Sequence, residues 1–246
     1  MRTLISTFAI LAGLATAAPA APPVIPPVTY PTLARTAPTA EGFAPAGWTI
    51  EQRQSGDLNG DGRPDLVLVL RDTNAANIVD NSGLGRRRLN TNPRMLAVAY
   101  ADAGGFRLAL QNHTLIPRET DPVLDDFIEG GGVSMGNGTF KVRLRRFSSA
   151  GSWGVETVTY TFKPRGDLIE MIGYDRTSTQ RNSGETRDVS INYVSGRMKI
   201  TTGTISGRGE RSVWRQAPGR RGLTLDQIGD GLDFDAEQAS ARPGAN

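Results

Sequence analysis

The 246-residue sequence contains no cysteine. This absence excludes a disulfide framework, a thiolate metal site, a cysteine nucleophile and lipid attachment through a lipobox cysteine. Histidine occurs once, which is too few for a typical catalytic zinc site. Stability must therefore come from a hydrophobic core, aided by any metal ion that the chain binds.

The chain also lacks a dominant charge of one sign. Its net charge is +3, with 28 basic and 25 acidic residues, and arginine far outnumbers lysine. Arginine clusters lie at 86–88, at Arg143, Arg145 and Arg146, and at 220–221, and we expect them to be solvated surface. No continuous basic face with interleaved aromatic residues is evident, so nucleic-acid binding is not expected.

Long apolar runs are absent except near the N-terminus. Arg2 precedes the apolar stretch "LISTFAILAGLATA", which ends in the small residues "ATAAPA". This pattern predicts a signal peptide over residues 1–20, cleaved after Ala17 or Ala20. A buried or anchoring helix is the alternative, but the run is shorter than the roughly 20 apolar residues of a membrane span. We therefore expect a periplasmic or secreted mature protein with no transmembrane segment.

The body of the chain shows the pattern of β-strands. Apolar residues alternate with polar ones in "FKVRLRRF" (140–147), "ETVTYTF" (156–162) and "DVSINYV" (188–194). This period of two predicts antiparallel strands with one wet face, about ten in number. No convincing helical stripe occurs, so residues 47–217 are predicted to form one all-β domain: a sandwich, a barrel or a partial, propeller-like meander.

Other segments are expected to connect or flank these strands. Glycine-rich hairpin turns are predicted at 102–105, 136–138, 164–167 and 194–197. Residues 73–93 are poor in apolar side chains and predict an exposed, mobile loop. Residues 21–46 are rich in proline and alanine and predict a semi-rigid linker that lies partly along the domain surface, and residues 218–246 predict a flexible tail.

The stretch "GDLNGDGRPDLVLVL" (56–70) carries the most specific chemistry. Oxygen-bearing side chains recur at alternate positions, and a glycine permits the sharp bend that such a loop needs. The spacing matches the D-x-[DN]-x-[DN]-G part of a calcium loop, and Ca²⁺ takes hard oxygen ligands. The predicted ligands over 57–65 are the side chains of Asp57, Asn59, Asp61 and Asp65 and the backbone carbonyl of Arg63, whose charge is expected to point away.

This loop is not expected to be an EF-hand. The position that would hold a bidentate Glu is Leu68, and the flanking runs "WTIEQRQSG" and "LVLVL" are strand-like. With three Asp and one Asn as side-chain ligands, we expect a calcium dissociation constant of about 10⁻⁴–10⁻³ M, the range of extracellular modules. The alternative is a polar turn without a metal.

The loop and the stretch that follows carry a family resemblance. "GDLNGDGRPDLVLVL" and "MLAVAYADAGGFRLAL" (95–110) together resemble the FG-GAP repeat of integrin-α-like β-propellers, also described in bacterial VCBS-repeat proteins. The resemblance implies calcium bound between two strands by Asp57, Asn59, Asp61, Arg63 and Asp65. Only one copy occurs, whereas a propeller needs several, so the resemblance implies a single repeat and not a complete propeller.

Two classes of function fit these features. The first is an exported, non-catalytic β-domain with a structural calcium, acting as an envelope or extracellular binding module for an unknown protein or glycan. The second is a hydrolase of polysaccharide or cell wall that uses carboxylates around 119–129, such as Asp125, Asp126 and Glu129. The same carboxylates also suit a polar turn. The single His113 is expected to be structural, and Trp153 and Trp214 are expected in the core, although either indole could stack on a sugar.

Overall fold

The computed structural model describes residues 21–166, 168–218 and 222–238, and the fold is all-β. Fourteen strands form antiparallel sheets, and helical structure in these residues is limited to three short 3₁₀ turns, Ala40–Phe43, Ala75–Asn77 and Leu225–Gln227. The predicted fold class is confirmed, with more strands than the ten expected. No helix in the part described could cross a membrane. The predicted signal peptide lies outside the described residues.

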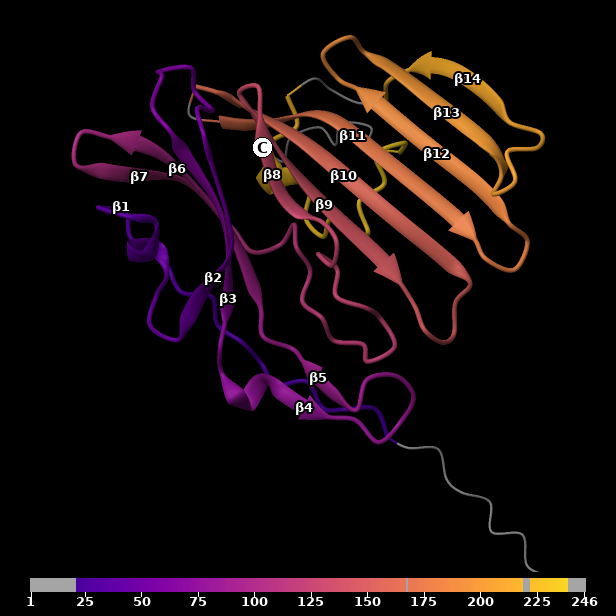
Figure 1. Ribbon diagram of the computed structural model, residues 1–246, viewed down its shortest axis with the longest axis horizontal. Helices are drawn as coiled ribbons and strands as arrows, with labels where there is room; N and C mark the ends of the chain where they lie inside the picture. Colours follow the sequence, from indigo (N-terminus) through magenta and orange to yellow (C-terminus); the bar gives the residue numbers. More distant parts are fainter. Residues whose placement is uncertain (1–20, 167, 219–221, 239–246) are drawn as a thin grey trace, which may run out of the picture.

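The first half of the chain builds a five-stranded sheet with the order β1-β7-β6-β3-β2 (Figure 1). Its strands are β1 (Thr36–Ala37), β2 (Trp48–Gly56), β3 (Asp65–Asp72), β6 (Arg94–Asp102) and β7 (Gly105–Asn112). A separate hairpin pairs β4 (Ile78–Asp80) with β5 (Arg88–Asn90). The central strands β3 and β6 are buried on both faces, which explains why "LVLVL" is continuously apolar instead of alternating.

The second half builds a seven-stranded meander in which each strand pairs with the next along the chain. Its strands are β8 (Gly132–Gly136), β9 (Thr139–Phe147), β10 (Gly154–Arg165), β11 (Leu168–Gln180), β12 (Glu185–Asn192), β13 (Arg197–Thr204) and β14 (Arg211–Gln216). Alternate side chains are buried along β9, β10 and β12. One face of this sheet therefore packs on the core, and the other meets solvent.

The two large sheets share one hydrophobic core. Val67, Val69 and Val98 from the five-stranded sheet belong to the same buried cluster as Phe140 and Tyr160 from the seven-stranded sheet. Neither sheet closes on itself among the described strands. Of the three architectures expected, this shared core between two open sheets corresponds to a sandwich.

The predicted linker is part of the fold, because it covers the other face of the five-stranded sheet. Its side chains Leu33, Ala37, Ala40 and Phe43 are buried in a second cluster with Leu66, Leu68, Leu70 and Met95. Thr36 and Ala37 also pair with β7. The expectation of a spacer over 21–46 is corrected by these contacts: the folded body begins well before residue 47.

The predicted flexible tail also packs against the body over its described part, 222–238. Leu225, Ile228, Leu232 and Ala236 are buried in the shared core, and the Tyr160 hydroxyl donates to the Gly231 carbonyl at 2.6 Å. The recurrence of apolar residues in this segment therefore marks packing, although it forms only one 3₁₀ turn and no longer helix.

The strands are joined mainly by short hairpin turns, and one longer connection is more ordered than the sequence predicts. Hairpin turns join β6 to β7, β8 to β9 and β12 to β13, where the sequence predicts them. Arg165 of β10 pairs with Leu168 of β11, and residue 167 of the turn predicted there lies outside the described residues. Asn137 and Gly138 have φ of 54° and 65°, the conformation of a two-residue hairpin turn. Residues 73–93, expected to be a mobile loop, instead contain the β4–β5 hairpin and the buried residues Asn77, Leu89 and Thr91.

Candidate functional site

The candidate calcium loop joins β2 to β3 at one end of the five-stranded sheet. The last pair of this hairpin is Gly56 with Asp65, so the loop spans residues 57–64 between two paired strands. Gly60 and Gly62 have φ of 83° and 81°, which a β-carbon would disfavour. The glycines therefore set the winding of the loop, as expected from the sequence.

Three of the predicted ligand side chains organise the loop backbone. The Asp57 carboxylate accepts hydrogen bonds from the amides of Gly60 at 2.7 Å and Gly62 at 2.9 Å. The Asn59 side-chain oxygen accepts from the Asp61 amide at 2.9 Å. The Asn59 amide group in turn donates to the Asp61 carboxylate at 3.2 Å. Asp57, Asn59 and Asp61 therefore belong to one tightly wound turn.

Asp65 has a different position, because it is fully buried at the start of β3. One of its carboxylate oxygens accepts from the amides of Leu58 at 2.8 Å and Asn59 at 3.3 Å, and the other accepts from the Ala101 amide at 2.8 Å. Asp65 thus ties the loop to the end of β6. This structural role is not evident from the ligand spacing alone.

The charge of Arg63 was expected to point away from the loop, but its side chain lies against the loop. Its guanidinium donates to the Asp61 carboxylate at 2.8 Å, and its backbone amide donates to the other oxygen of the same group at 2.9 Å. These bonds lower the pKa of Asp61. Arg63 therefore occupies an oxygen that a bound cation would need.

The donor chemistry of the loop fits calcium in part. Within the described residues, no three acidic or histidine side chains lie close enough together to hold a metal ion. The available oxygens are those of Asp57, Asn59 and Asp61 and the Arg63 carbonyl, while Asp65 is committed to backbone amides. These four groups are the oxygens that the loop could offer to a cation, and Arg63 occupies one oxygen of Asp61.

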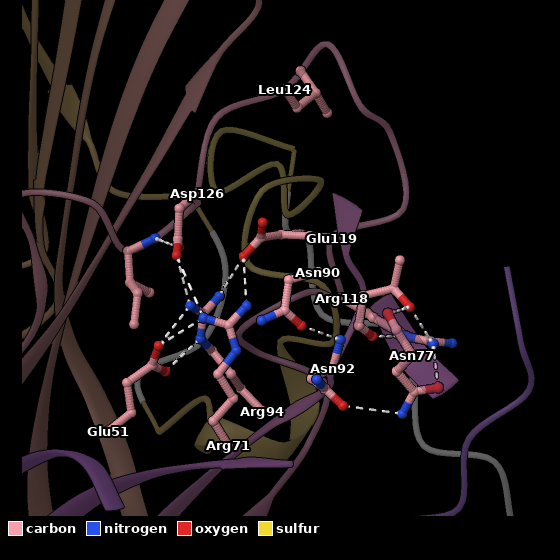
Figure 2. A network of polar contacts seen from close by, with 12 residues as sticks. Glu51, Arg71, Asn77, Asn90, Asn92, Arg94, Arg118, Glu119, Leu124 and Asp126 are labelled. Atoms are coloured by element: carbon pink, nitrogen blue, oxygen red, sulfur yellow. Dashed lines mark hydrogen bonds and ion pairs between the residues drawn. The ribbon is translucent and has the colours of Figure 1, made fainter. Parts of the chain in front are cut away.

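A second polar site, missed by the sequence reasoning, surrounds the buried Arg94 (Figure 2). Arg94 lies at the start of β6, and its side chain is 2% exposed. It contacts Glu51 through two nitrogens at 2.6 and 2.8 Å, Glu119 at 2.7 Å and Asp126 at 2.7 Å. These contacts join β2, β6 and the segment between β7 and β8.

Two further arginines complete this network. Arg71 contacts Glu51 at 2.9 Å and lies 3.7 Å from Glu119. Arg86 contacts Glu119 at 3.0 Å and donates to the Leu124 carbonyl at 2.7 Å. Three carboxylates therefore face three guanidiniums, which balances the charge of the site.

The arginines of the network lower the pKa of two of its carboxylates, Glu51 and Asp126. Burial alone would raise the pKa of Glu51, but hydrogen bonds and charge from Arg94, with Arg71, outweigh it and lower the pKa. The pKa of Asp126 is lowered by Arg94 against the same opposing effect of burial. Burial would lower the pKa of Arg94, whereas its bonds to Glu51 and Asp126 raise it further above its usual value. The three groups are charged at neutral pH.

Arg118 forms an adjoining cluster that ties the N-terminal segment to the β4–β5 hairpin. Its guanidinium donates to the Thr91 backbone carbonyl, to the Thr91 hydroxyl at 2.8 Å and to the Pro26 carbonyl at 2.7 Å. Asn77 links Asp72 at 2.9 Å with Asn92 at 3.1 Å. Each of these contacts joins separate segments of chain, and none presents a reactive group.

Three carboxylates considered for catalysis, Asp125, Asp126 and Glu129, line one open groove. Glu119 and Asp126 lie in the Arg94 network, and Asp125 lies 3.6 Å from Arg145. His113 stacks on Tyr30, with ring centroids 4.3 Å apart. The expectation that the tryptophans are in the core is wrong, because Trp153 and Trp214 are 61% and 57% exposed. Neither tryptophan lines the open groove formed by Glu51, Gln52, Arg86, Asp125, Asp126, Ile128 and Glu129.

In comparisons with protein-family models, curated proteins and solved structures, the chain matches none of them. The resemblance of residues 56–70 and 95–110 to an FG-GAP or VCBS repeat remains a prediction from the sequence.

Proposed function

We propose that this protein is an exported, non-catalytic β-domain that acts as an envelope or extracellular binding module. The observation that carries the proposal is the Arg94 network. It fixes Glu51, Glu119 and Asp126 between arginines, and the lowered pKa values of Glu51 and Asp126 are the opposite of what a general acid requires at neutral pH. The network therefore serves the fold.

The alternative, a hydrolase that uses carboxylates around 119–129, has less support. A glycosidase needs one carboxylic acid with a raised pKa opposite a second carboxylate. Here Glu119 and Asp126 contact the same guanidinium, and neither exposed tryptophan lies beside them to stack on a sugar. The contacts of Glu119 and Asp126 with Arg94 favour a structural role for these two groups.

Calcium at residues 57–65 is part of the proposal, as a structural ion. The loop closes a strand hairpin, and Asp65 already links it to β6. Asp57, Asn59, Asp61 and the Arg63 carbonyl would hold the ion, whose charge would offset the carboxylates of the turn. Its effect would be to stabilise the β2–β3 hairpin, with no chemical step.

The experiment is a paired test of binding and hydrolysis with the mature protein. Envelope polysaccharides and envelope proteins are immobilised, and binding is measured alongside release of reducing ends and peptides. Binding without turnover is the expected result. Turnover of a polysaccharide that is lost in Glu119→Gln, while the variant remains folded by circular dichroism, would replace this proposal with the hydrolase.

A further inference from the structure

The seven-stranded sheet has a broad solvent-exposed face, to which the proposed binding function has so far assigned no role. Figure 1 shows β9 to β14 as one continuous sheet with β14 at its outer edge. We define the outer face as the side of this sheet opposite the core residues Val142, Val158 and Val189. Strand register then identifies the side chains that lie in rows across it.

Two neighbouring rows cross the sheet from β9 to β14. The first consists of Arg143, Thr159, Asp175, Ser190, Lys199 and Trp214, each paired with the next. The second consists of Lys141, Thr161, Gly173, Asn192, Arg197 and Gln216. Both rows are basic at β9 and again at β13. Between these positions lie Thr159, Asp175 and Ser190 in the first row and Thr161, Gly173 and Asn192 in the second.

The β13–β14 end of the outer face combines an exposed indole with two cations. Trp214 lies directly opposite Lys199, and the Arg197 guanidinium lies 4.2 Å from the Trp214 ring centroid. The indole remains 57% exposed, so Arg197 leaves much of it open to a ligand. An exposed aromatic beside arginine and lysine suits a planar group that carries, or adjoins, an anion.

We propose that the outer face binds a linear anionic polysaccharide that runs across the strands from β9 to β14; this inference rests on the proposed binding function. The two basic strands, β9 and β13, are four strand spacings apart, roughly 19 Å. A chain with repeated carboxylates or sulfates can contact both strands at once, whereas a small anion contacts only one. Trp214 provides a stacking surface for a sugar ring at the far end.

The chemistry between the basic strands favours a sugar polymer over other polyanions. Thr159, Thr161 and Ser190 offer hydroxyls to sugar hydroxyls, and Asp175, which accepts from Ser190 at 2.6 Å, disfavours a densely charged phosphate backbone. Single-stranded nucleic acid would need successive aromatic platforms, and these two rows hold one. A protein partner would favour a more apolar centre.

Binding of polygalacturonate, with dextran as the neutral polymer, tests the inference on the mature protein by calorimetry. The expected result is binding to polygalacturonate that weakens with salt, tighter binding of long chains than of the trisaccharide, and no binding to dextran. Trp214→Ala and the double variant Arg197→Ala/Lys199→Ala should each weaken binding about tenfold. Trp214→Phe should retain more affinity than Trp214→Ala, because it keeps an aromatic ring.

The matched control is Arg87→Ala/Arg88→Ala, which removes the same charge from exposed positions at the β4–β5 hairpin. This control should bind polygalacturonate like the wild type. Equal loss in the control, equal binding of dextran, or tighter binding of single-stranded DNA that depends on Trp214 would overturn the inference. If polygalacturonate does not bind but an envelope component does, the inference fails and the proposed function stands; if nothing binds, both fail.

Discussion

Arg94 and Glu119 form an ion pair of 2.7 Å between side chains that are each only 2% exposed. The pair joins the start of β6 to the segment that leads into the seven-stranded sheet. Removing one partner would leave an uncompensated charge in a buried site. Substitution of either residue is therefore expected to destabilise the fold strongly.

The first prediction concerns the loss of Arg94. Arg94→Met should lower the free energy of unfolding by about 3–5 kcal/mol, because Glu51, Glu119 and Asp126 would lose their shared partner. Urea unfolding at pH 7 measures the loss. Arg53→Ala is the control, because it breaks the exposed pair of Arg53 with Glu41 and should change stability little. Equal losses in the two variants would contradict a special role for the buried network.

The second prediction is an acid-dependent loss of stability that originates in the same network. Glu51 and Asp126 have pKa values below those of the unfolded chain, so the folded state binds fewer protons. Their contribution is present above the unfolded values of about 4 and is lost as pH falls through the lower, folded values. The urea midpoint should fall more steeply with pH below about 4 in the wild type than in Arg94→Met. Parallel curves would assign the acid sensitivity to other carboxylates.

Local features of the fold could be predicted from the sequence, and long-range ones could not. Hairpin turns such as Asn137–Gly138 follow from local backbone preferences. The packing of Leu33 and Leu225 depends on faces that only the assembled sheets create. Their proline- and glycine-rich surroundings, taken alone, predict a spacer and a tail. A signal for the network was present: Arg94 begins the otherwise apolar run "RMLAVAY", and a charge in a buried strand requires a partner.

In the candidate calcium loop, too, the local features could be predicted from the sequence and the long-range contacts could not. The spacing of Asp57, Asn59 and Asp61 places their side chains in one turn, which local geometry determines. The three backbone partners of Asp65, including the distant Ala101, depend on pairing of β3 with β6. The ion pair of Arg63 with Asp61 depends on the side-chain conformation of Arg63, which the ligand pattern does not specify.

The third prediction tests the packing of the C-terminal segment. A β-carbon at Gly231 would lie 2.6 Å from the Leu115 carbonyl oxygen and 2.7 Å from a Leu144 methyl. Gly231→Ala should therefore destabilise the protein by about 1–3 kcal/mol through overpacking. Gly104→Ala is the control, because nothing lies within 4 Å of that position. Equal thermal midpoints for the two variants would mean that residues 222–238 are not held against the core in solution.

The fourth prediction concerns export. The mature chain should begin at Ala18 or Ala21, after cleavage at A-x-A spacing. Intact-mass measurement of the exported protein reads the new N-terminus directly. A full-length product in the cytoplasm would remove the basis for an envelope or extracellular function.

The last prediction is that millimolar calcium stabilises the protein through residues 57–65. With a dissociation constant near 10⁻⁴ M, 1 mM calcium adds about 1.4 kcal/mol to the free energy of unfolding, which corresponds to about 3–6 °C in melting temperature. Asp61→Ala should abolish this increment, and Gly62→Val should do the same by straining a residue at φ of 81°. Thermal melts with calcium and with chelator measure the increment.

Two further variants separate ligation from structure in this loop. Arg63→Ala keeps the backbone carbonyl and frees the Asp61 oxygen that the guanidinium occupies, so it should tighten calcium binding. Asp65→Ala should lower the melting temperature with and without calcium, because the amides of Leu58, Asn59 and Ala101 lose their shared acceptor. If calcium leaves the wild-type midpoint unchanged and gives no binding heat, and Arg63→Ala behaves likewise, the loop is a polar turn and its aspartates serve the backbone alone.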